Sequence, residues 1–128
     1  MKKTILIVDD EEMVVDITKR KLTQDGFLII GVHNGEEALK VLQQGPVDLI
    51  ILDIEMPKMN GYIFLSERKK IPGGDKAPVI VLTAYDSMEP IFRRNGAVEY
   101  LTKPIRFQEL LDKIYGIVGG SNEHCKEP

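Results

Sequence analysis

The sequence predicts a three-layer α/β/α sandwich, in which helices cover both faces of a five-stranded parallel sheet. Apolar runs of strand length alternate with segments of helical spacing, five times along the 128 residues. One of these runs, residues 49–52, is apolar at every position, as is typical of a strand buried on both faces of a parallel sheet. Strict alternation of this kind implies right-handed crossovers, which place helices on both faces.

The expected strands are short apolar runs that cover residues 4–9, 27–32, 47–53, 78–82 and 98–102. The first two expected helices carry clear start and stop signals. The helix over residues 10–24 opens with three acidic residues, which suit the positive end of the helix dipole. Asn34 is a predicted N-cap with Glu37 three residues later, which is the spacing of a capping box, and Gly45 ends this helix.

The last three expected helices differ in length. The third lies within residues 61–71. The fourth is short, with Ser87 as its predicted cap and Pro90 in its first turn, where a missing N–H costs little, and Gly96 closes it. The last, residues 107–118, repeats apolar residues at i, i+3, i+4 and i+7, which predicts one buried face.

Size, charge and cysteine content describe one ordinary globular domain. We expect this domain to span residues 1–120, followed by a disordered tail over residues 121–128. The net charge of −3 gives no general attraction to nucleic acid or anionic lipid, and the apolar runs are too short to cross a membrane. The single cysteine, Cys125, excludes an internal disulfide. We therefore expect a cytoplasmic chain that binds neither nucleic acid nor membranes by itself.

Residues capable of chemistry stand at the carboxyl ends of four of the expected strands, and these residues are Asp9 and Asp10, Asp53, Thr83, and Lys103. Each has an ordinary explanation, because an aspartate can open a helix or a turn, a threonine can end a strand and a lysine can be a solvated surface charge. The carboxyl ends of parallel strands, however, meet at one edge of a sheet. Their shared placement therefore favours a single site.

The chemistry of this set favours phosphoryl transfer. Three neighbouring carboxylates repel one another unless a cation lies between them, and Mg²⁺ prefers such oxygen ligands. Lys103 adds a positive charge and Thr83 a hydroxyl donor, both of which suit phosphoryl oxygens. Asp53 can then act as the nucleophile and form an acyl phosphate.

The sequence resembles the receiver domain of two-component response regulators, in particular the chemotaxis-regulator type. The resemblance covers residues 3–118, and the motifs that carry it are Ile7-Val8-Asp9-Asp10-Glu11, Asp53-Ile54-Glu55-Met56-Pro57-Lys58-Met59-Asn60-Gly61, Val81-Leu82-Thr83-Ala84 and Gly96-Ala97-Val98-Glu99-Tyr100-Leu101-Thr102-Lys103-Pro104. It implies a flavodoxin-like, doubly wound sheet in the order 2-1-3-4-5.

The resemblance also implies a metal site. Asp53 would be the phosphoacceptor. The carboxylates of Asp10 and Asp53 and the backbone carbonyl of Glu55 would hold Mg²⁺, or Mn²⁺ in its place, and Asp9 would act through water.

Other roles follow from the same resemblance. Lys103 would pair with the phosphoryl oxygens, and Thr83 would be the hydroxyl that moves toward them on phosphorylation. Tyr100 would turn from outside to inside as Thr83 shifts, and the Lys103–Pro104 peptide bond would be cis.

The implied partners are a phosphodonor and an effector. The donor would be a phosphohistidine on a sensor histidine kinase or a histidine phosphotransfer protein, docked beside residues 12–15. The effector would read the face formed by the fourth helix, the fifth strand and the fifth helix. The chain would be a monomer or a phosphorylation-dependent dimer.

Glu55 and Tyr85 lie two positions after Asp53 and Thr83, beside the path of a water that would attack the phosphoryl group. An acid there repels and a ring shields, so we expect the domain to remove its own phosphoryl group only slowly.

Three alternatives explain parts of the pattern. A flavodoxin-like cofactor binder needs an anion-accepting loop after the first strand, but residues 9–12 are all acidic. A haloacid-dehalogenase-like phosphatase also has paired acids, but here the second acid is Glu55 and Met56-Pro57 follows. A receiver-like domain that only binds is disfavoured, because no key residue is missing.

Overall fold

The structure is a computed structural model, and it describes residues 2–56, 59–84, 89–94 and 96–119. Within these ranges it contains a five-stranded parallel sheet in the order β2-β1-β3-β4-β5, which confirms the expected fold class. The strands are β1 (Thr4–Val8), β2 (Leu28–Val32), β3 (Leu49–Asp53), β4 (Val79–Thr83) and β5 (Ala97–Thr102). The helices are α1 (Glu12–Gln24), α2 (Gly35–Gln44), α3 (Gly61–Glu67), α4 (Glu89–Arg94) and α5 (Phe107–Val118), with a 3₁₀ turn over Arg68–Lys70.

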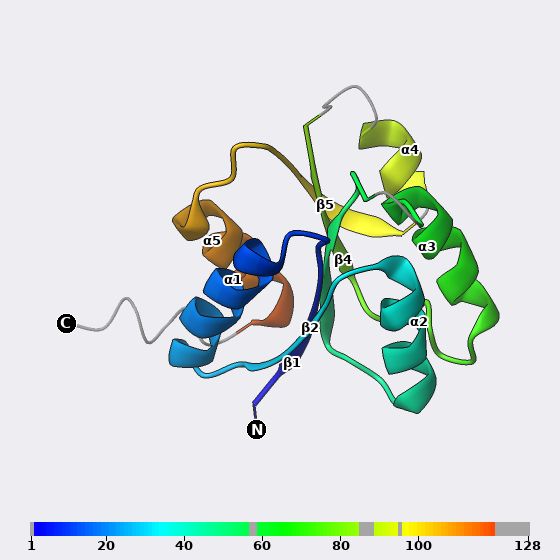
Figure 1. Cartoon of the computed structure of the whole chain (residues 1–128), viewed down its shortest axis with the longest axis horizontal. Helices are drawn as coiled ribbons and strands as arrows, with labels where there is room; N and C mark the ends of the chain where they lie inside the picture. Colours follow the sequence, from blue (N-terminus) through cyan, green and yellow to red (C-terminus); the bar gives the residue numbers. More distant parts are fainter. Residues whose placement is uncertain (1, 57–58, 85–88, 95, 120–128) are drawn as a thin grey trace.

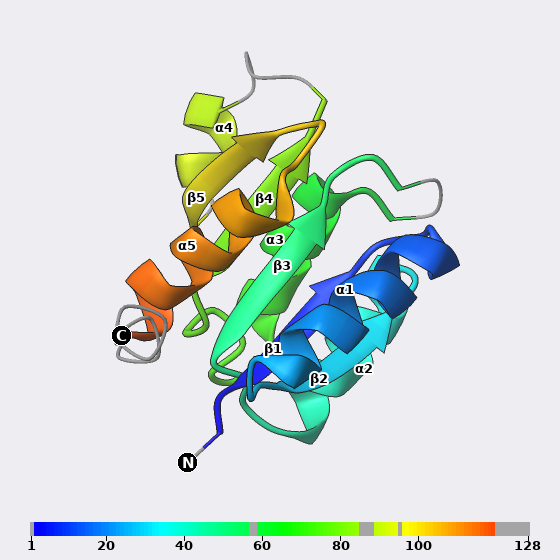
Figure 2. The same ribbon diagram turned by 90° about the vertical axis from the view of Figure 1, so that its left-hand side faces the viewer.

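The sheet separates two apolar cores. Helices α1 and α5 cover one face, and α2, α3 and α4 cover the other (Figure 1). Figure 2 shows the sheet with α1 and α5 in front of it. Because successive strand residues point to opposite faces, Ile51 packs into the core under α1 and α5, while Ile50 and Leu52 pack into the other. All five residues of β3 are buried, which the apolar run over residues 49–52 predicts for the first four.

Helix α1 begins later than the sequence suggests. The Oδ1 atom of Asp9 accepts a hydrogen bond from the N–H of Glu11 at 2.9 Å, so the chain forms a local turn before the helix starts at Glu12. Within α1, Val15 and Leu22 are buried. Three apolar side chains are instead exposed to solvent, namely Met13 at 73%, Val14 at 36% and Ile17 at 44%.

The caps of α2 and α3 are asparagines. The Oδ1 atom of Asn34 accepts the N–H of Glu37 at 2.8 Å, as predicted. The carboxylate of Glu37 reaches the N–H of His33, so the second bond of the expected capping box is made one residue earlier than usual. Asn60 caps α3 by accepting the N–H of Ile63 at 2.9 Å.

The expected third helix is divided into α3 and the 3₁₀ turn that holds Arg68. This arginine is only 2% exposed, and its Nη1 atom donates to the carbonyl oxygens of Gly74 and Ala77, each at 3.2 Å. A side chain at Gly96, where φ is +102°, would collide with the same guanidinium group. Arg68 therefore joins the end of α3 to the loop before β4 and to the start of β5.

Helix α4 is short, as expected. Its predicted cap, Ser87, and the predicted tail over residues 121–128 lie outside the described residues. In the part of the chain that is described, no helix is both long enough and apolar enough for a membrane crossing.

Replacing Asn60 by alanine should lower the free energy of unfolding by about 1 kcal/mol, because the first turn of α3 loses its side-chain acceptor. Urea denaturation measures the change. Asn60→Asp keeps an acceptor oxygen and should lose clearly less. An Asn60→Ala protein as stable as the wild type would show that the cap contributes nothing.

Candidate functional site

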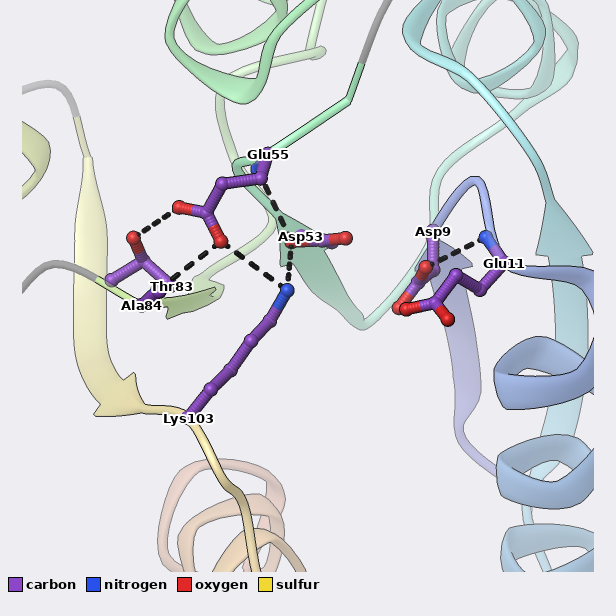
Figure 3. Close-up of polar contacts among 7 residues, drawn as sticks. All are labelled: Asp9, Glu11, Asp53, Glu55, Thr83, Ala84 and Lys103. Atoms are coloured by element: carbon purple, nitrogen blue, oxygen red, sulfur yellow. Dashed lines mark hydrogen bonds and ion pairs between the residues drawn. The ribbon is translucent and has the colours of Figure 1, made fainter.

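Three carboxylates meet at the carboxyl edge of the sheet. Val8 pairs with Leu52 across β1 and β3, so the residues that follow them, Asp9 and Asp53, lie level with each other. Asp9, Asp10 and Asp53 each place one carboxylate oxygen within 4.8 Å of the others. Figure 3 shows one oxygen of Asp53 pointing toward Asp9. Clustered carboxylate oxygens are the donor set of a hard divalent cation, so the predicted metal-binding residues fit such an ion.

Burial makes this cluster costly to ionise. Asp9 is 4% exposed and Asp53 is 1% exposed, whereas Asp10 reaches solvent. Burial, with a smaller contribution from the charge of Asp53, raises the pKa of Asp9 to about 6, although the hydrogen bond from the Glu11 N–H lowers it. Burial also raises the pKa of Asp53, although Lys103 opposes this. A cation between the carboxylates would favour their charged forms and so lower both pKa values again.

Lys103 supplies the positive charge of the site. Its Nζ atom lies 2.8 Å from Oδ1 of Asp53 and 3.2 Å from Oε1 of Glu55. Burial alone would lower the pKa of Lys103, but its hydrogen bonds and ion pairs with the two carboxylates outweigh this and raise it. Lys103 therefore remains an ammonium ion. The Lys103–Pro104 peptide bond is cis, as the resemblance implies.

The carboxylate of Glu55 accepts hydrogen bonds from the other two donors of the site, Thr83 and Ala84. Its carboxylate accepts the hydroxyl of Thr83 at 2.5 Å and the N–H of Ala84 at 3.1 Å, while its own N–H donates to Oδ1 of Asp53 at 3.2 Å (Figure 3). From the sequence we expected only the carbonyl of Glu55 at the metal and its side chain beside the path of a water. The side-chain contacts with Thr83 and Ala84 were missed, because a residue two positions past a strand gives no signal of which strand it will reach.

The remaining predicted residues lie near this edge or outside the described chain. Tyr100 on β5 is partly buried and packs against the core under α2 and α3. Tyr85 lies outside the described residues.

Two hollows flank the sheet at opposite edges. A groove of about 390 Å³ runs from the acidic cluster between α1 and the start of α5, and it is lined in part by Asp9, Val14, Ile17, Lys103 and Phe107. Another, of about 450 Å³, lies at the opposite edge beside residues 71–77 and has no acidic residue in its lining. The groove beside α1 is therefore the one connected with the chemistry.

Comparison with known proteins assigns the fold and site to a family. Residues 5–115 match the family model of the response regulator receiver domain. The chain belongs to this family. Receiver domains are the phosphoaccepting domains of two-component signalling, so the match decides against a flavodoxin-like cofactor binder and a dehalogenase-like phosphatase.

Individual relatives agree with this assignment. The response regulator GtcR of Aneurinibacillus migulanus is 36% identical over 116 residues, which are 89% of this chain and 47% of GtcR. The structure of the response regulator TrrA of Thermotoga maritima, in complex with Mg²⁺-BeF, is 40% identical, with a TM-score of 0.78 over 91% of this chain and 99% of TrrA. A CheY-like receiver domain protein of Methanospirillum hungatei is 32% identical, with a TM-score of 0.82 over 100% of both chains.

The chain spans about half the length of most curated relatives that it matches. The family assignment therefore applies to the receiver domain alone.

Asp9→Asn should raise the free energy of unfolding of the metal-free protein by about 1 kcal/mol. The amide removes a buried negative charge next to Asp53 and keeps the oxygen that accepts the N–H of Glu11. Added Mg²⁺ should then stabilise the variant less than the wild type. For the wild type, a Mg²⁺ concentration 100-fold above Kd should raise the free energy of unfolding by about 2.7 kcal/mol. Thermal unfolding with and without Mg²⁺ measures both effects.

The matched control is Asp16→Asn, which removes a charge from the exposed side of α1. It should leave the response to Mg²⁺ unchanged. An equal response to Mg²⁺ in the Asp9 variant and the wild type would argue against metal binding at this cluster.

Proposed function

We propose that Asp53 accepts a phosphoryl group from a phosphohistidine of a sensor histidine kinase or a histidine phosphotransfer protein. The observation that carries this proposal is the ion pair of 2.8 Å between Asp53 and Lys103, in a buried position that faces two further carboxylates. A carboxylate held beside a fixed ammonium group and a cation site is a suitable nucleophile toward phosphorus.

In the transfer, one carboxylate oxygen of Asp53 attacks phosphorus in line with the P–N bond of the phosphohistidine. The O–P bond forms as the P–N bond breaks, and the imidazole leaves with the electron pair of that bond and takes up a proton. Lys103 holds Asp53 in place and balances the charge that collects on the phosphoryl oxygens. The hydroxyl of Thr83 and the N–H of Ala84, which bond to Glu55 beside Asp53, are the further donors that could turn to the phosphoryl oxygens.

The proposed metal ligands are the carboxylates of Asp10 and Asp53 and the backbone carbonyl of Glu55, with Asp9 acting through water. The acidic cluster supports this set, and the relative TrrA was solved with Mg²⁺-BeF. When bound, Mg²⁺ or Mn²⁺ would neutralise the carboxylates and the phosphoryl oxygens.

Phosphorylation would then change the surface of the domain. It adds about −1.5 to −2 charges beside Thr83 and Lys103. We infer that Thr83 moves toward the new oxygens, that Tyr100 turns inward, and that the face formed by α4, β5 and α5 presents the change to an effector. Whether this effector face also forms a dimer, and whether the chain works in the cytoplasm, stay predictions.

The exposed side of α1 is the proposed docking surface for the phosphodonor. Met13, Val14 and Ile17 are exposed apolar side chains, and the last two also line the groove that leads to Asp9 and Lys103. A helix of the donor packed there would bring its phosphohistidine to the acidic edge.

We also propose that the acyl phosphate is long-lived. Glu55 lies beside Asp53, and its negative charge would repel a hydroxide or a polarised water on the way to phosphorus. The proposed shielding by Tyr85 concerns a residue outside the described part of the chain.

Asp53→Asn should abolish phosphorylation, because an amide is not a nucleophile toward phosphorus. Incubation with acetyl phosphate and Mg²⁺, followed by mass spectrometry, should show a gain of about 80 Da in the wild type only. An Asp53→Asn protein that gains the same mass would refute the assignment of the acceptor.

The double variant Met13→Gln/Ile17→Gln should slow phosphoryl transfer from a phosphorylated histidine phosphotransfer domain about tenfold, since it removes two exposed apolar contacts. Phosphorylation by acetyl phosphate needs no docking and should stay unchanged. Ile63→Gln, at an equally exposed apolar residue of α3, is the control and should affect neither rate. A double variant that accepts phosphoryl groups from the protein donor at the wild-type rate would place docking elsewhere.

A further inference from the structure

The side chain of Glu55 is surrounded by hydrogen-bond donors from two other strands. Its Oε2 atom accepts the hydroxyl of Thr83 at 2.5 Å. Its Oε1 atom accepts the N–H of Ala84 at 3.1 Å and lies 3.2 Å from Nζ of Lys103. Figure 3 shows these contacts converging on one carboxylate next to Asp53. Both oxygens of Glu55 are therefore occupied by donors from β4 or from the end of β5.

The same donors are the ones that a phosphoryl group on Asp53 would need. A phosphoryl group brings nearly two negative charges and three strong acceptor oxygens. Nζ of Lys103 bridges Asp53 and Glu55, at 2.8 Å and 3.2 Å, so one ammonium group contacts both the proposed phosphoacceptor and the Glu55 carboxylate. Thr83 and Ala84 reach the site from the adjacent strand β4.

We propose that the carboxylate of Glu55 is an internal substitute for the phosphoryl group, which occupies the donors of Thr83, Ala84 and Lys103 until phosphorylation displaces it. This inference rests on the function proposed above for Asp53. It goes beyond the role of Glu55 in the lifetime of the acyl phosphate, because it concerns the unphosphorylated protein.

Two consequences follow from this arrangement. First, the donors stay hydrogen-bonded and ordered in the unphosphorylated domain, since unpaired polar groups at a partly buried site are costly. Second, a phosphoryl group must compete with the Glu55 carboxylate for these donors. Phosphorylation is therefore less favourable than it would be if Glu55 left the donors open to solvent. Hydrogen bonds to a charged acceptor are stronger than those between neutral groups. The negative charge of Glu55 is therefore the main reason that it competes with a phosphoryl group.

Two substitutions separate the charge of Glu55 from its reach. Glu55→Gln keeps the size of the side chain but lacks the negative charge, and only one of its two terminal atoms can accept. Glu55→Asp keeps the charge but is one methylene shorter, so it should not reach Thr83 and Ala84. Glu36→Gln is the matched control, because Glu36 is an exposed glutamate in the first turn of α2, and its loss changes the net charge equally.

The test uses the full chain labelled with ¹⁵N and followed by NMR. In the metal-free protein, the amide proton of Ala84 should move upfield in both Glu55 variants, because it loses a charged acceptor, and it should not move in Glu36→Gln. Titration with beryllium fluoride at saturating Mg²⁺ should then give a Kd about fivefold lower for Glu55→Gln than for the wild type, and an unchanged Kd for the control.

Several results would overturn the inference. One is an Ala84 amide signal that stays at its wild-type position in either Glu55 variant. Another is a Kd of Glu55→Gln equal to or higher than that of the wild type. Such results, in a wild type that still binds beryllium fluoride and is phosphorylated at Asp53, would refute the role of Glu55 and leave the proposed function intact. A wild type that neither binds beryllium fluoride nor gains the phosphoryl mass would instead refute the proposed function.

Discussion

The crowding of negative charge at one edge of the sheet is the constraint around which the site is built. Backbone pairing brings the charges together, since Asp53 lies opposite Leu82 in β4, and Thr83 lies opposite Thr102 in β5. The functional side chains therefore lie at the ends of neighbouring strands, from β1 through β3 and β4 to Lys103 after β5. Within the described residues this lysine pairs with both Asp53 and Glu55. Its single ammonium group offsets part of the negative charge of the clustered carboxylates.

This arrangement opposes stability, and the apolar strands offset it. The carboxylates of Asp9 and Asp53 are buried, so they lose the solvation that water would give them. Such a loss of stability is typical of a functional site. Directly beneath them, β1 and β3 carry side chains that pack into the cores on both faces of the sheet. The burial of these strands is what allows acidic residues to stand at their ends.

The sequence predicted the parts of the structure that depend on local pattern. The run over residues 49–52 predicted a doubly buried strand, Asn34 predicted a cap, and the polar residues after four strands predicted their convergence. It failed where a tertiary contact decides the outcome. The spacing of apolar residues in α1 does not by itself show that Val15 and Leu22 are buried while Val14 and Ile17 lie exposed. The reach of Glu55 to Thr83 and the burial of Arg68 likewise depend on which segments become neighbours, which no single stretch encodes.

The two ends of the sheet are held by different kinds of hydrogen bond, and the buried guanidinium group of Arg68 holds the end opposite the acidic cluster. Its bonds to the carbonyls of Gly74 and Ala77 are buried, and breaking them would leave each buried carbonyl without its donor, at a cost of about 1–3 kcal/mol per group. At the acidic edge, by contrast, the bonds of Thr83 and Ala84 end on a flexible glutamate side chain. The donors at the acidic edge can therefore change partners by a rotation of one side chain, whereas the bonds of Arg68 open only if the loop before β4 moves.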